Sequence, residues 1–90
     1  MELIDAVKQL ARLDEDLAIY ARKPWTPLST TRLVSRGSEE VDELMALGLV
    51  HLVDVSEARD ILEDWRIARN PRPTDEQCCL HLIAHARSEE

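Results

Sequence analysis

Apolar side chains at the start of the chain follow a helical period. They recur at spacings of three and four residues, at Leu3, Ile4, Val7, Leu10 and Ala11. This spacing places them on one face of an amphipathic helix, which we predict over residues 2–13. Asp14, Glu15 and Asp16 follow. Because carboxylates are unfavourable at the negative end of a helix dipole, these acids mark its end.

The next two segments have the character of strands. Residues 16–22 (DLAIYAR) alternate between two faces, and residues 30–36 (TTRLVSR) are rich in β-branched side chains before Gly37. Both patterns predict a strand. The intervening loop contains two prolines, so we expect the two strands to form a wide hairpin.

A helix and a third strand are predicted next. Residues 38–48 begin with Ser38, which can cap a helix, and end with Gly48, which suits the left-handed position after one. The segment LVHLVDV (49–55) is apolar at five of seven positions. A strand of this kind is typically covered on both faces, so we place it in the middle of the sheet or near it.

Two further helices complete the pattern. Residues 56–70 are amphipathic, with Trp65 on the apolar face, and Asn70-Pro71 ends them. Thr74 and Gln77 have the spacing of a capping box, which opens a last helix running to about Ser88. The order α-β-β-α-β-α-α predicts an α+β fold with a small three-stranded sheet packed by about four helices. Residues 1–90 are expected to form a single domain.

Charge is distributed unevenly along the chain. The net charge is −7. Residues 38–64 hold nine acids and one base, which gives −8, whereas residues 17–37 hold four bases and no acid, which gives +4. Such a protein should repel nucleic acid over most of its surface and attract a cationic partner to its middle third.

Several classes of protein are disfavoured by the composition. No apolar run is long enough for a membrane span, and the start lacks the pattern of a secretory signal, so we expect a cytoplasmic protein. The adjacent cysteines Cys78 and Cys79 cannot readily pair with each other, so both are expected to be reduced thiols. Nucleotide-binding and hydrolase motifs are absent from the sequence.

Trp25 lies between Pro24 and Pro27 in a basic loop. The prolines reduce the entropy lost when the indole is held in place. This helps either of two roles, a plug that covers the protein's own core or an anchor offered to a partner. Self-association through this loop is a further alternative, and the sequence leaves a monomer and a homodimer both open.

One constellation could carry chemistry. Cys78, His81 and His85 fall within an arc of about 60° on the last predicted helix, and thiol and imidazole are ligands for zinc. A metal- or thiol-dependent enzyme or sensor is therefore the alternative function. Against it, a second ligand-bearing segment is lacking, and His51 in the third strand is better explained as a half-buried residue with one hydrogen bond. No cofactor, bound metal or catalytic residue is expected.

The stretches DLAIYARKPWTPLS and GLVHLVDVSEARDILEDW resemble a family of small uncharacterised bacterial proteins with an "IYA..PWTP.S" segment followed by "GL.Y.L.V..A...LE.W". Some proteins of this kind look like immunity proteins paired with bacterial toxins. At His51 the family pattern has an aromatic residue, so the strand is more polar here. The resemblance implies no catalytic residues.

The leading interpretation is a small, acidic, non-enzymatic protein-binding domain. The most concrete version is an immunity or antitoxin-type inhibitor that occludes a basic partner such as a bacterial toxin. Nuclease toxins are attractive partners because they must be basic to hold nucleic acid. The expected contact residues are Trp25, Asp42, Glu43, Asp60, Glu63 and Asp64.

Overall fold

A computed structural model describes residues 1–89. Its elements follow the predicted order, and they are α1 (Leu3–Lys8), the short 3₁₀ helix η1 (Leu10–Arg12), β1 (Leu17–Arg22), β2 (Thr31–Ser35), α2 (Glu40–Ala46), β3 (Leu49–Asp54), α3 (Val55–Ile67) and α4 (Asp75–Ser88). The α+β class and the three-stranded sheet are thereby confirmed. The first helix differs from the prediction because it breaks at Gln9 and continues as η1.

The sheet is antiparallel, with strand order β2-β1-β3. The β1–β2 hairpin is confirmed, but the most apolar strand, β3, lies at an edge and β1 is central. An irregularity explains the difference. Ile19 pairs with Val53 and Tyr20 pairs with His51, so Leu52 is an extra residue in β3. The bulge places Leu52 and Val53 together in the main core. An edge strand can therefore carry the run of apolar residues that is typical of a central strand.

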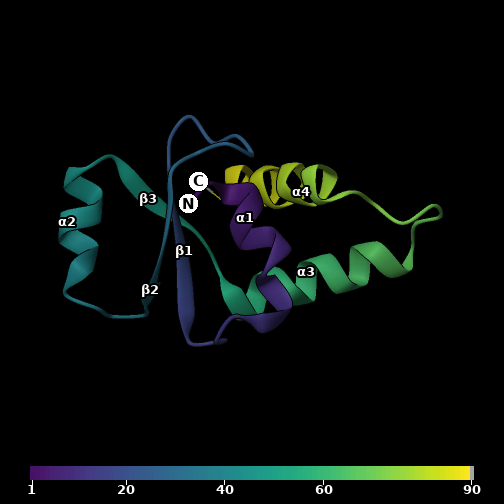
Figure 1. The fold of residues 1–90 in the computed structure, drawn as a ribbon, viewed down its shortest axis with the longest axis horizontal. Helices are drawn as coiled ribbons and strands as arrows, with labels where there is room; N and C mark the ends of the chain where they lie inside the picture. The colour runs from purple at the N-terminus through teal and green to yellow at the C-terminus, as the bar shows by residue number, and fades with distance from the viewer. Residues whose placement is uncertain (90) are drawn as a thin grey trace.

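Two hydrophobic cores of unequal size lie on the two faces of the sheet. The larger one is formed with α1, α3 and α4, and its largest fully buried side chains include Leu3, Ile19, Leu62 and Leu82. The smaller one is formed by Val34, Leu44 and Leu49, with Tyr20 and Val41 beside them. Figure 1 shows α2 alone on one side of the sheet and the other helices on the opposite side. Both faces of β3 are therefore covered, as expected.

Local chemistry fixes the ends of the helices. In α4 the Thr74 hydroxyl accepts a hydrogen bond from the Gln77 N–H, and the Gln77 side chain accepts one from the Thr74 N–H, so the predicted capping box is present. In α2 the Ser38 hydroxyl accepts from the Glu40 N–H at 3.2 Å. Gly48 has φ +85°, the left-handed conformation expected after α2.

Candidate functional site

The outer face of α3 carries a stripe of acids. Asp60, Glu63 and Asp64 are exposed and follow a spacing of three and four residues, which places them within an arc of about 100° on the helix. Ile67 continues the stripe by one more turn and is 78% exposed. Asp60, Glu63, Asp64 and Ile67 are called the α3 stripe below.

The two arginines of α3 are directed away from this stripe. Arg59 donates from its Nε to the Leu10 carbonyl at 3.0 Å and from its terminal nitrogen to the Leu13 carbonyl. Arg66 donates to the Cys78 Sγ at 3.4 Å. Within residues 1–89 no ion pair involves Asp60, Glu63 or Asp64. The helix therefore presents its negative charges to solvent and holds its positive charges against η1 and α4.

A groove of about 710 Å³ runs beside the stripe, between η1 and α3. Its apolar lining comes from Leu10, Ala11, Leu62 and Ile67. Glu63 and Ile67 belong to both the groove and the stripe. Arg59, Arg66 and Arg72 also line the groove, which therefore combines apolar side chains with three cationic ones.

The acids of α2 form a second surface. Glu39, Glu40, Asp42 and Glu43 are all exposed at its beginning, where they interact favourably with the helix dipole. At the other end Arg22 donates to the Leu47 carbonyl at 3.2 Å, so a cation also complements that end of the dipole. The α2 acids thus have a structural role that the acids of the α3 stripe lack.

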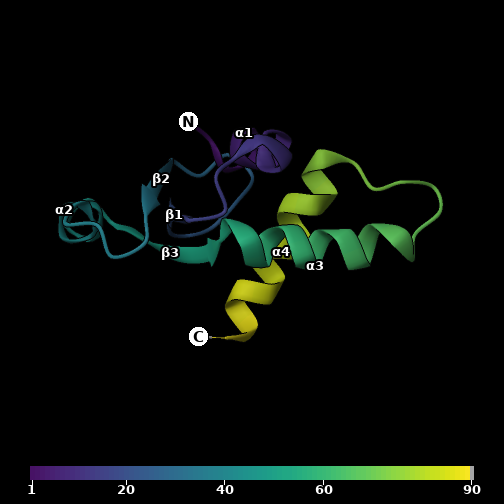
Figure 2. The ribbon, with the colours of Figure 1, turned by 90° about the horizontal axis from the view of Figure 1, so that it is seen from below.

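The two acidic helices are separated in space. Figures 1 and 2 show α2 at one end of the molecule, while α3 extends from the sheet toward the opposite end. The sequence suggested one acidic region over residues 38–64, and the fold divides it into two surfaces.

Trp25 belongs to the main core. It is 5% exposed, and its indole N–H donates to the Ala21 carbonyl at 3.0 Å. Lys23 lies over the ring with its Nζ 4.8 Å from the centroid. The plug role is therefore confirmed, and the expected contact role of Trp25 is wrong for the folded chain because the indole offers almost no surface to a partner.

Within the described part of the chain, the ligand atoms of Cys78, His81 and His85 do not converge as a group of three. Cys78 and Cys79 are free thiols, as expected, but both are buried. Burial, assisted by Cys78 and two nearby acids, raises the pKa of Cys79 to about 12, so this thiol stays protonated and unreactive near neutral pH. His81 contacts Trp65, and His85 contacts two glutamates.

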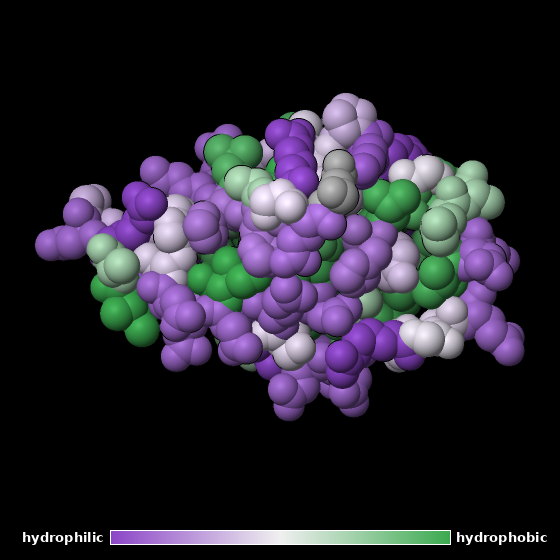
Figure 3. Space-filling view, turned by 180° about the vertical axis from the view of Figure 1, so that it is seen from behind, coloured by the Kyte–Doolittle hydropathy of each residue, from purple (hydrophilic) through white to green (hydrophobic). Residues whose placement is uncertain are grey.

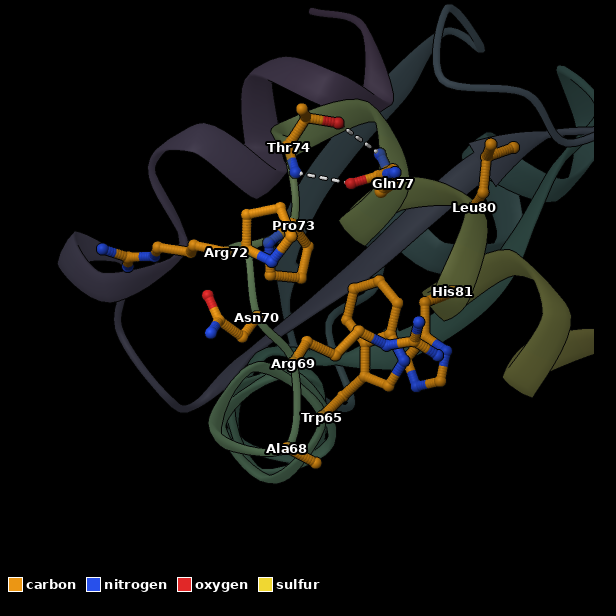
Figure 4. Close-up of a pocket in the computed structure, with 11 residues that line it drawn as sticks. Trp65, Ala68, Arg69, Asn70, Arg72, Pro73, Thr74, Gln77, Leu80 and His81 are labelled. Carbon is orange, nitrogen blue, oxygen red and sulfur yellow. Dashed lines mark hydrogen bonds between the residues drawn. The ribbon is translucent and has the colours of Figure 1, made fainter.

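His81 stacks on Trp65 with ring centroids 4.2 Å apart and an angle of 7° between the planes. The guanidinium carbon of Arg69 lies 4.6 Å from the centroid of the same indole. Trp65 is partly buried and packs against the main core rather than lying fully inside it. Burial, followed by the charges of Arg69 and His85, lowers the pKa of His81. Figure 4 shows these three side chains together in a pocket formed by α3, α4 and their connection. The capping pair of α4 also lines it.

His85 approaches two carboxylates. Its Nε2 lies 3.2 Å from Glu57 Oε1 and 3.1 Å from Glu89 Oε1. Neither glutamate was singled out from the sequence, although the spacing of His85 and Glu89 by one helical turn is visible there. Glu57 is 28 residues from His85, so only the fold brings them together.

The His51 side chain on β3 is 46% exposed, close to the half-buried environment that the sequence predicts. It makes one hydrogen bond, as expected, with Asp54 at 2.9 Å. It also lies edge-on to Tyr20, with ring centroids 5.5 Å apart. Two partners on the surface account for this histidine without a catalytic role.

The exposed apolar side chains are scattered. Figure 3 shows several small hydrophobic patches separated by polar atoms on the face seen from behind. The large exposed ones are Met1, Leu28, Met45, Leu47, Ile67 and Leu80. Of these, only Ile67 lies both on an acidic stripe and in an apolar groove. This combination makes the α3 stripe and its groove the strongest candidate for a binding surface.

No protein-family model, curated protein or solved structure matches this chain. Among the helices of residues 1–89, none has the length and apolar character needed to cross a membrane.

Proposed function

We propose that this protein is a non-enzymatic binding domain that docks the α3 stripe and the adjoining groove on a basic surface of another protein. The most specific form of the proposal is an immunity-type inhibitor that covers a bacterial toxin. Asp60, Glu63 and Asp64 pair with cationic side chains of the partner, and an apolar partner side chain fills the groove beside Ile67.

The observation that carries this proposal is the division of charge across α3. Arg59 and Arg66 bond to carbonyl and thiol acceptors inside the chain, so the acids on the outer face are not neutralised by their own helix. Unpaired carboxylates steer a basic partner during its approach and set its orientation. An apolar anchor in a groove then supplies binding energy that charges at a rim do not.

The acids Asp42 and Glu43 of α2 take a different place in this proposal. They lie at the opposite end of the molecule from the far end of α3, so a partner of ordinary interface size need not cover both. A standard interface buries about 800 Å² on each partner. We therefore assign primary contact to α3 and treat α2 as a separate acidic surface.

Two charge-reversal variants test the assignment. The α3 variant is D60K/E63K/D64K and the matched α2 variant is E39K/D42K/E43K. Each changes the net charge by the same amount, +6. The wild-type chain serves as bait in cells of its source, and the basic protein it retains is then purified and its affinity measured with each variant.

We expect the α3 variant to bind that protein about 100-fold more weakly or worse, because three attractive pairs become repulsive. The α2 variant should bind within a few-fold of wild type. For the inhibitor form of the proposal, co-expression of wild type and the α2 variant, but not the α3 variant, should relieve the partner's toxicity. Equal losses in both variants would instead reflect net charge alone, and unchanged affinity in the α3 variant would refute the proposed surface.

A further inference from the structure

Three side chains that commonly ligate metals converge where the start of α3 meets the end of α4. They are Glu57, His85 and Glu89, and their ligand atoms all lie within 4.8 Å of one another. They are partly exposed, at 44%, 30% and 62% of their side-chain surfaces respectively. Within residues 1–89 this is the one such group of three histidine, cysteine or acidic residues.

The fold explains why these groups meet. His85 and Glu89 are one turn apart on α4, so they project from the same face of the helix. Glu57 lies in the first turn of α3, and α3 and α4 are packed together in the main core. Two elements that are already fixed by the core therefore supply the three groups.

The electrostatics of the cluster favour a cation. Two carboxylates are directed at the same imidazole nitrogen, Nε2 of His85. A ring nitrogen carries at most one proton, so it cannot give both glutamates a full hydrogen bond. The carboxylates also repel each other. A divalent ion between the three groups would accept electron pairs from all of them and remove that repulsion.

The distances have the right scale for coordination. Metal–nitrogen and metal–oxygen bonds of zinc are about 2.0–2.2 Å, and at tetrahedral or right angles they hold neighbouring ligand atoms about 3.0–3.5 Å apart. The His85 Nε2 lies at 3.2 Å from Glu57 Oε1 and 3.1 Å from Glu89 Oε1. The Glu57 and Glu89 oxygens also lie within 4.8 Å of each other.

We propose that Glu57, His85 and Glu89 form a binding site for a divalent transition-metal ion, with water completing the coordination. One imidazole and two carboxylates suit Zn²⁺, and also Mn²⁺ or Co²⁺, better than they suit the soft ions that prefer thiolates. A bound ion links the first turn of α3 to the last turn of α4. The inference is independent of the proposed docking surface, which uses other residues.

Another histidine provides an internal comparison. His51 meets a single carboxylate, Asp54, at 2.9 Å. It has the same pair of functional groups but no third ligand within the part of the chain that the structure describes. His51→Gln is therefore the matched control for His85→Gln.

The site is tested by titrating chelator-treated protein with Zn²⁺ in a calorimeter and with Co²⁺ in a visible spectrometer. We expect one ion per chain with a Kd in the micromolar range, and d–d absorption without the strong near-ultraviolet band of a thiolate ligand. E57Q, H85Q and E89Q should each weaken binding at least tenfold, with circular dichroism showing that the fold is retained. H51Q should bind like wild type.

A second readout guards against a variant that simply fails to fold. Zn²⁺ at a fixed concentration above the wild-type Kd should raise the unfolding midpoint of wild type and H51Q equally and that of E89Q, the most exposed substitution, clearly less. No stoichiometric binding, a thiolate band, or equal losses in H51Q and H85Q would each overturn the assignment.

Discussion

The helices α2 and α3 are both acidic, yet the fold uses their charges differently. The acids of α2 are concentrated at its start, and Arg22 donates to the carbonyl of Leu47, the C-cap residue, so the charges at both ends complement the helix dipole. On α3 the acids lie along the outer face, and the arginines are turned toward η1 and α4. A similar content of acids thus stabilises the short helix α2, whereas on α3 it leaves carboxylates without ion pairs on the outer face.

The two helices also differ in what they cover. α2 closes a small core around Leu44, whereas α3 contributes Leu62 to a core that includes both buried cysteines. The number of charges in a segment therefore says little about its role until the neighbours of each side chain are known.

Truncating one leucine in each core should separate the two regions most strongly. Leu62→Ala should lower the free energy of unfolding by about 3–5 kcal/mol, because the surrounding large core cannot collapse around the cavity. Leu44→Ala should cost about 2 kcal/mol, at the low end for this substitution. Urea denaturation of both variants measures the difference, and equal losses would show that the smaller core is as rigid as the larger one.

The buried thiols should report which core opens. Cys78 and Cys79 lie in the main core, and burial raises the pKa of Cys79 to about 12, so labelling requires opening of that core. A loss of about 3 kcal/mol in Leu62→Ala should speed labelling about 100-fold or more. Leu44→Ala should mainly accelerate amide exchange in α2. If Leu44→Ala accelerated labelling of the cysteines as much as Leu62→Ala does, the two cores would open as one unit.

Charge reversal should affect stability through α2 more than through α3. Lysine in place of Glu40 and Asp42 meets the positive end of the helix dipole, so this double variant should lose about 1 kcal/mol at low salt. D60K/D64K, in the middle and last turn of α3, should be nearly neutral. Thermal melts in low and high salt measure both, and the α2 effect should shrink as salt is added.

The smallest effect concerns the pH dependence of His81. Its pKa is lowered in the folded chain by burial and by Arg69 and His85, so the unfolded chain binds a proton more tightly. Above the ordinary pKa of histidine neither state binds this proton, so His81 does not affect the free energy of unfolding. As the pH falls from that value through the lower pKa of folded His81, the unfolded state binds the proton first and the free energy of unfolding decreases slightly. Arg69→Gln should raise the pKa of His81 in an NMR titration.

Much of the fold was predictable because its signals are local. Ser38 and Gly48 bracket α2, Thr74 and Gln77 start α4, and alternation defines β1. The order of strands was not predictable, because the extra residue Leu52 makes an edge strand as apolar as a central one. Gln9 interrupts the first helix without a sequence feature such as proline or glycine to indicate it.

The candidate sites were predicted less completely because they depend on contacts between distant segments. The α3 acids were expected, but the inward course of Arg59 depends on the Leu10 and Leu13 carbonyls, which are 49 and 46 residues away. The indole of Trp25 was assigned two possible roles, and only its burial distinguishes them. The partners of His85 likewise include Glu57, which no spacing rule connects to it.

The arrangement of aromatic side chains gives the two halves separate optical signals. Trp25 and Trp65 both contact the main core, while the single tyrosine, Tyr20, packs beside the smaller one. Fluorescence excited at the red edge of the indole band therefore follows the α3 and α4 side alone. Loosening around α2 would leave that emission unchanged while altering the near-ultraviolet dichroism of Tyr20, so unlabelled protein can distinguish local from global melting.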